Sequence, residues 1–88
     1  MTLYEKISEY IETQDSDDLE QYFDGIEKCA LELYPDHNVY IYDYDTGNDT
    51  YELDRQLDDI LDLAKRHKIV DFCNCWDNDK IITTIITK

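Results

Sequence analysis

Negative charge is spread very unevenly along this chain of 88 residues. Residues 1–64 hold 19 Asp and Glu against three Lys and Arg, whereas residues 65–88 hold five Lys and Arg against three Asp. The formal net charge is −14. Because charge of one sign repels itself and destabilises a compact state, any fold of this chain has to keep most of its carboxylates in water.

Composition nevertheless favours a folded chain over a disordered one. Disordered acidic chains are poor in aromatic and β-branched residues, whereas this chain has eight Tyr, two Phe, one Trp and 42% hydrophobic residues. We expect a single domain over residues 1–88. Its core should be thin, because a domain of this size buries only about two-thirds of its unfolded surface.

The predicted location is the cytoplasm. Residues 1–6 lack the basic start and apolar core of a signal peptide, and no apolar run approaches the roughly 20 residues that span a bilayer. Three Cys is an odd number, which argues against a secreted disulfide framework. We expect no direct binding to membranes or to nucleic acid, because an acidic surface repels both.

Three segments have the apolar spacing that is typical of amphipathic helices. They cover residues 3–13, 19–33 and 51–66. Pro35 marks the end of the second segment. Each segment begins near a capping pair, and these pairs are Thr2 with Glu5, Asp17 with Glu20, and Asp49 with Glu52.

Three shorter runs rich in β-branched and aromatic residues predict strands at Val39–Tyr44, Ile69–Trp76 and Ile81–Thr87. Residues 77–80 read as a hairpin turn between the last two. A strand–helix–strand crossover favours parallel pairing of the first two strands, and the hairpin adds an antiparallel third. The predicted fold class is α/β (α+β), a two-layer domain of order α-α-β-α-β-β with helices packed on a three-stranded mixed sheet.

With the apolar stripes turned inward, carboxylates form rows on the outer faces of all three predicted helices. Like charges three and four residues apart destabilise a helix by about a few tenths of a kcal/mol per pair. Few Lys or Arg stand where they would offset this cost. The rows contain Glu5, Glu9 and Glu12; Glu20, Asp24 and Glu27; and Asp54, Asp58, Asp59 and Asp62.

The spacing within these rows suggests the kind of partner. Steps of about 5–6 Å along a helix are close to the separation of about 6–7 Å between neighbouring phosphates on a nucleic-acid strand. Lys and Arg in a nucleic-acid-binding groove would therefore find carboxylates at about the spacing of the phosphates that they normally bind. We expect a basic nucleic-acid-binding protein as the partner, the alternative being a solvated surface that serves solubility alone.

Tyrosines are concentrated in the first predicted strand. Tyr40, Tyr42 and Tyr44 share one face of it, with Asp43 and Asp45 beside them. The three rings fit two roles, a core wall under a helix or anchors in an interface, since Tyr is enriched at binding hot spots. The sequence leaves both roles open.

The sequence predicts no metal, no cofactor and no catalytic site. The segment Asp43–Asp49 has oxygen ligands at alternating positions, but the glycine and the final glutamate of an EF-hand loop are misplaced. Cys73 and Cys75 are separated by one residue, whereas structural zinc sites use wider gaps and a second pair. Because no phosphate-binding loop or serine-nucleophile motif is present, we expect a protein that is not an enzyme.

The run Tyr40–Asp45, followed after a short turn by the acidic helix Tyr51–Arg66, resembles a segment of Ard-type antirestriction proteins. Those proteins are strongly acidic DNA mimics from mobile elements that occupy the DNA groove of restriction enzymes. In size and charge the chain is also similar to phage-encoded anti-CRISPR proteins and to inhibitors of uracil-DNA glycosylase. The resemblance implies a protein that imitates DNA.

Charge and resemblance together predict a DNA-mimic inhibitor that blocks the nucleic-acid-binding channel of a host defence nuclease, a CRISPR effector or a restriction enzyme. It would act as a monomer or homodimer, in the host cytoplasm if a phage encodes it. Two alternatives remain, an immunity or antitoxin protein that neutralises a basic nuclease toxin, and a small calcium-binding or adaptor module built on Asp43–Asp49. The residues expected to contact the partner are Glu5, Glu9, Glu12, Glu20, Asp24, Glu27, Tyr40, Tyr42, Asp43, Tyr44, Asp45, Asp54, Asp58, Asp59 and Asp62.

Overall fold

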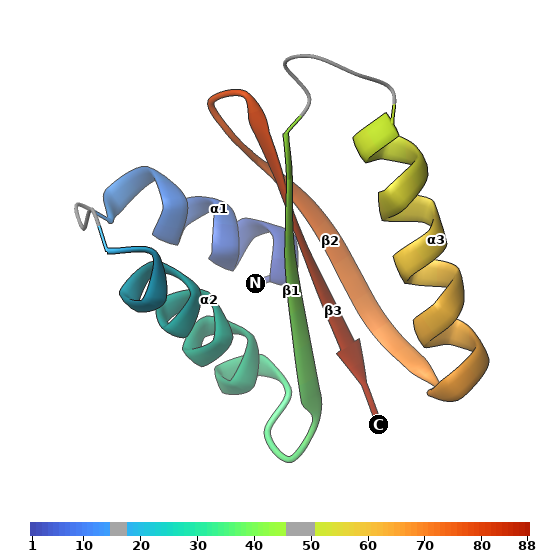
Figure 1. Cartoon of the computed structure of the whole chain (residues 1–88). Helices are drawn as coiled ribbons and strands as arrows, with labels where there is room; N and C mark the ends of the chain where they lie inside the picture. The colour runs from blue at the N-terminus through green and yellow to red at the C-terminus, as the bar shows by residue number, and fades with distance from the viewer. Residues whose placement is uncertain (15–17, 46–50) are drawn as a thin grey trace.

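A computed structural model of the chain has three helices and three strands in the predicted order, α-α-β-α-β-β (Figure 1). It describes residues 1–14, 18–45 and 51–88, without the side chains of residues 51–53. The predicted strands are confirmed to within one residue at each end. The elements are α1 (Leu3–Thr13), α2 (Leu19–Leu33), β1 (Asn38–Asp45), α3 (Tyr51–Arg66), β2 (Ile69–Asp77) and β3 (Lys80–Thr87).

Local side-chain contacts fix where the first two helices begin. The Thr2 hydroxyl accepts a hydrogen bond from the backbone N–H of Glu5 at 3.1 Å, which confirms the predicted cap of α1. At α2 the capping residue is Asp18, whose carboxylate accepts from the backbone N–H of Glu20 at 2.9 Å. The predicted caps Asp17 and Asp49 lie outside the described residues.

The predicted mixed sheet is wrong, because all strand pairs are antiparallel and the strand order is β1-β3-β2. β1 and β2 do run in the same direction, but β3 lies between them. The reason is burial. Every residue of Ile81–Thr87 is buried, so β3 is covered on both faces and belongs at the centre, whereas β2 alternates between buried and more exposed positions.

The predicted two-layer arrangement is also wrong, because helices cover both faces of the sheet (Figure 1). α1 and α2 pack together on one face, where Leu3, Ile7 and Ile26 form the main core with Ile82 and Ile86 of β3. α3 lies on the opposite face, nearest to β1. Because β3 faces a helix on each side, its unbroken run of Ile and Thr is accounted for.

A small polar network attaches α3 to the sheet. The side-chain amide of the buried Gln56 donates to Asn74 Oδ1 and to Thr83 Oγ1, both at 2.8 Å. The Thr83 hydroxyl donates in turn to Asn74 Oδ1 at 2.8 Å. The three side chains therefore satisfy one another, and they fix one point of α3 above the junction of β2 and β3.

Among the residues described, none of the helices combines the length and the apolarity that crossing a bilayer requires.

Candidate functional site

The outer surface of the α1–α2 hairpin carries a group of solvent-exposed carboxylates that form no ion pair among the described residues. All six predicted members are exposed, and none of them forms an ion pair within the described part of the chain. Lys6 Nζ lies 2.5 Å from Glu32, so this lysine is engaged by a carboxylate outside the group. We call this group the acidic face, and its members are Glu5, Glu9, Glu12, Glu20, Asp24 and Glu27.

The carboxylates of α3 behave differently. Asp54 and Asp58 are exposed. Asp62 is also exposed, but its Oδ2 atom lies 2.5 Å from Arg66 Nη2, and the two side chains form an ion pair one helical turn apart. Asp59 is half-buried and accepts a hydrogen bond from the Tyr44 hydroxyl at 2.7 Å. Two members of the predicted row of four thus have partners in the fold, and the other two, Asp54 and Asp58, are exposed.

The three predicted rows do not form one surface. The acidic face lies on one side of the sheet, and the carboxylates of α3 lie on the other (Figure 1). A partner that contacts one side along a flat surface cannot reach the other without wrapping around the molecule. The sequence could not show this division, because it depends on which face of the sheet each helix covers.

The tyrosines of β1 face α3. Tyr44 is 2% exposed, stacks on Tyr42 with ring centroids 6.1 Å apart, and donates to Asp59. Burial, followed by the hydrogen bond to Asp59, raises the pKa of Tyr44 above its usual range. Tyr44 is therefore a core residue. Tyr40 and Tyr42 are half-buried, and Tyr40 lies against the ring of His67 at 6.0 Å.

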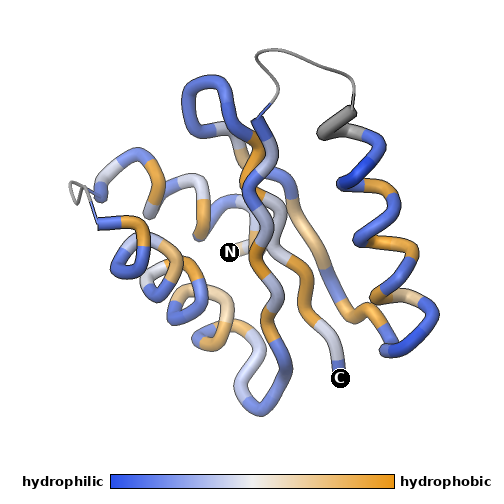
Figure 2. The backbone as a smooth tube through the Cα atoms, viewed as in Figure 1, coloured by the Kyte–Doolittle hydropathy of each residue, from blue (hydrophilic) through white to orange (hydrophobic). Residues whose placement is uncertain are grey.

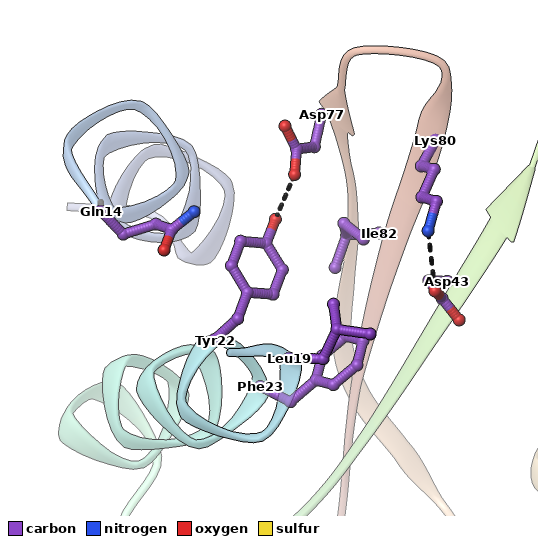
Figure 3. Close-up of a pocket in the computed structure, with 8 residues that line it drawn as sticks. All are labelled: Gln14, Leu19, Tyr22, Phe23, Asp43, Asp77, Lys80 and Ile82. Atoms are coloured by element: carbon purple, nitrogen blue, oxygen red, sulfur yellow. Dashed lines mark hydrogen bonds and ion pairs between the residues drawn. The ribbon is translucent and has the colours of Figure 1, made fainter. Parts of the chain in front are cut away.

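One pocket, of about 120 Å³, lies between the start of α2 and the β2–β3 hairpin (Figure 3). Tyr22 donates to Asp77 Oδ2 at 3.0 Å, and Lys80 Nζ lies 3.7 Å from Asp43 Oδ2 across the strands. Burial, and then this bond to Asp77, raises the pKa of Tyr22. Ligand sites usually exceed about 300 Å³, and these polar groups are already paired. The pocket is best explained as a structural feature.

The described residues contain no group of three or more side chains suited to holding a metal ion. Of the predicted calcium segment, Asp43 and Asp45 are exposed at the end of β1, and residues 46–49 lie outside the described part. The Cys73 and Cys75 side chains are buried against α1, where Ser8 Oγ lies 3.4 Å from Cys75 Sγ. The neighbouring Cys75 thiol, together with burial, raises the pKa of Cys73. Both are packing residues of the core.

The sequence missed an exposed apolar surface along β2. The apolar stripe of the third helix was expected to turn inward, yet Leu57 and Leu61, which belong to it, are 60% and 58% exposed. Phe72 and Trp76 of β2 are 51% and 61% exposed. Figure 2 shows hydrophobic positions along both β2 and α3. The sequence signals only that residues 72–76 carry no charge, because the edge position of this strand is decided by the fold.

Comparison of the chain with models of protein families, with curated proteins and with solved structures finds no match.

Proposed function

We propose that this protein is an inhibitor that imitates nucleic acid and occupies the basic nucleic-acid-binding channel of a defence nuclease, such as a CRISPR effector or a restriction enzyme. The observation that carries the proposal is the acidic face. It presents six exposed carboxylates, none of which is within ion-pair distance of a cation among the described residues. A cationic channel would supply the missing charge.

The spacing of these carboxylates fits a channel that accepts phosphates. Glu5 and Glu9, and likewise Glu20 and Asp24, are four residues apart on one helix. A rise of 1.5 Å per residue separates such positions by about 6 Å along the axis, which is close to the phosphate spacing of about 6–7 Å. Lys and Arg arranged to neutralise phosphates would find carboxylates at similar intervals.

The hairpin that carries the acidic face is held firmly in one geometry. A Cβ atom at Gly25 would lie 2.0 Å from Tyr10 Oη, so the absence of a side chain there lets the two helices approach closely. The Tyr10 hydroxyl donates to the Gln21 carbonyl at 3.3 Å, and Lys6 pairs with Glu32. Because the two helices that carry the carboxylates are already packed together before binding, association has to order only side chains and not the backbone.

Displacement of DNA tests the proposal. Purified CRISPR effectors and restriction enzymes, each bound to a fluorescent DNA duplex, are titrated with the protein. We expect at least one of them to release its DNA, with association that slows steeply as salt is raised, because electrostatic steering is screened. The double variant Glu9→Gln, Asp24→Asn should need about tenfold more protein for the same displacement.

The matched control is Asp36→Asn, Asp62→Asn, which changes the net charge equally but alters carboxylates outside the acidic face. It should displace DNA as the unaltered protein does. A nuclease that binds the protein tightly while still holding its DNA would contradict mimicry. If both double variants displace DNA equally weakly, net charge alone would explain the displacement, and the position of the acidic face would not matter.

A further inference from the structure

β2 is an edge strand whose central residues 72–76 have no charged side chain, while a register irregularity between Ile69 and Asp71 and the charged Asp77 lie at its two ends. Among the described strands, β2 pairs only with β3, so its outer side offers unpaired backbone groups. Natural proteins protect edges of this kind with charged side chains or proline. The other edge strand, β1, has exposed Asp43 and Asp45. Residues 72–76 at the middle of β2 carry no charge.

Exposed apolar side chains gather along this strand. Of the eight large hydrophobic side chains that are exposed in the described part of the chain, Val70, Phe72 and Trp76 belong to β2 itself. The backbone carbonyl of Tyr4 lies 3.9 Å from Cys75 Sγ, so α1 passes beside β2 at Tyr4, whose side chain is exposed.

Leu57 and Leu61 belong to α3, which lies on the opposite face of the sheet from α1. Asp59 reaches Tyr44 on β1. Positions two residues from Asp59 lie about 160° around the helix from it. Gln56, which bonds to Asn74 of β2, lies between Asp59 and Leu57 around the helix. Leu57 is therefore on the β2 side of α3, and Leu61 lies beside it toward solvent. We call Tyr4, Leu57, Leu61, Val70, Phe72 and Trp76 the apolar edge.

We infer that the apolar edge docks an extended cationic segment of the partner, which adds to β2 as a fourth strand. Strand addition to an open edge takes affinity from main-chain hydrogen bonds and specificity from alternate side chains. Apolar residues at every second position would pack on Phe72, Trp76 and Leu57. The nine residues of β2 are long enough to pair with a segment of similar length.

Charge determines which occupant fits. Asp54 and Asp58 are exposed next to the leucines of α3, and Glu5 is exposed next to Tyr4. Lys or Arg between the apolar residues of the docked segment would lie near these carboxylates. A second copy of the chain would instead bring two molecules of net charge −14 together with their carboxylates facing one another. The surface therefore suits a cationic partner better than a copy of itself.

This inference rests on the proposed function in one respect, that the partner is cationic. It adds a second contact, on a different part of the molecule from the acidic face. Main-chain and apolar contacts are screened by salt less than ion pairs are. The partner would then be steered by charge and held by the apolar edge.

A peptide titration followed by the emission of Trp76, the one Trp in the chain, tests the inference. The probe is an eight-residue peptide of alternating Lys and Val, and its control has the same lysines with Pro in place of two Val. We expect the first peptide to shift the emission of Trp76 to the blue and to slow amide hydrogen exchange in residues 72–76. The proline peptide should bind at least tenfold more weakly, because it cannot complete the strand ladder.

The double variant Leu57→Ser, Leu61→Ser should weaken binding of the alternating peptide at least tenfold. Leu19→Ser is its matched control, since Leu19 is 60% exposed, as Leu57 is, but lies at the start of α2. Circular dichroism checks that both variants fold. Equal binding of the two peptides, or an unchanged affinity of the double variant, would overturn the inference.

Sedimentation of the protein alone tests the rival occupant. A dimer that the double variant dissociates would show that a second copy fills the apolar edge, and would overturn the assignment to a cationic partner. The two proposals also fail separately. If the acidic-face variant loses DNA displacement while the peptide does not bind, the proposed function stands and only the apolar edge is wrong.

Discussion

At the scale of single residues, two tyrosine–aspartate pairs link helices to the sheet. Tyr44 of β1 donates to Asp59 of α3, and Tyr22 of α2 donates to Asp77 of β2. Both rings are nearly inaccessible, and the pKa of each tyrosine is raised, first by burial and then by its carboxylate partner. Each hydroxyl can act as a donor only while it keeps its proton. These pairs therefore make the fold sensitive to alkaline pH.

Tyr44→Phe should reveal this sensitivity. A hydrogen bond to a charged, partly solvated acceptor adds about 1–2 kcal/mol at most to the free energy of unfolding. The Tyr44→Phe variant should therefore have a free energy of unfolding that is roughly 1 kcal/mol lower at pH 7. Unfolded tyrosine ionises near pH 10, whereas the folded pKa is higher. The contribution is thus fully present below about pH 10 and is lost as the pH rises further.

Urea unfolding of both proteins between pH 7 and pH 11 measures the effect. The difference in unfolding free energy between the unaltered protein and Tyr44→Phe should shrink above about pH 10. A difference that stays constant over the whole range would show that the Tyr44 hydroxyl is not held in its protonated form by the fold.

At the scale of elements, α3 is attached to the sheet at few points. Gln56 bonds to Asn74 and Thr83, and Tyr44 bonds to Asp59, while Leu57 and Leu61 stay in solvent. α1 and α2, by contrast, share a continuous apolar core with the sheet. Regions with few buried apolar contacts open more readily than the rest of a protein. α3 should therefore be the helix that opens most easily.

Gln56→Ala should expose that difference. The change removes two hydrogen bonds and buried side-chain volume at the centre of the α3 contact, so we expect a loss of about 2 kcal/mol. Hydrogen exchange should accelerate in α3 more than in α1 or α2. Lys65→Ala, an exposed change in the same helix, is the control and should have little effect. Uniform acceleration in all three helices would mean that α3 does not open on its own.

At the scale of the whole molecule, charge and stability are in opposition. The net charge of −14 is carried by a chain whose carboxylates on the acidic face have no ion-pair partner among the described residues. Repulsion between them is stronger in the compact state than in the expanded unfolded state. The acidic face is thus a cost to folding that binding to a cationic partner would relieve.

Salt should stabilise this protein. Raising sodium chloride from about 0.02 M to about 0.5 M shortens the screening length several-fold, and we expect the unfolding free energy to rise by roughly 1–2 kcal/mol. Glu9→Gln, Asp24→Asn should be more stable at low salt and gain less from added salt. Thermal unfolding across the salt series measures both. A fall in stability with salt would mean that attractive pairs dominate the folded state.

Most of the local structure was predictable from the sequence, and for local reasons. Apolar periodicity identified α1 and α2, the Thr2 cap and the position of Pro35 marked ends, and runs of β-forming residues identified the strands within one residue. Hydrogen bonds inside a helix and contacts between neighbours along the chain decide these features. The exposure of the acidic face follows similarly, because charged side chains stay in water.

Strand pairing and the position of α3 could not be obtained in that way. β3 takes the centre because only its run of Ile and Thr can be buried on both faces at once, and this depends on helices distant in sequence. The same arrangement leaves Leu57, Leu61 and Trp76 in solvent and puts the carboxylates of α3 on the far side from the acidic face. The sequence by itself determined the helices, the strands and the charge, whereas only the tertiary structure decided which surfaces they share, because burial is a property of the whole fold.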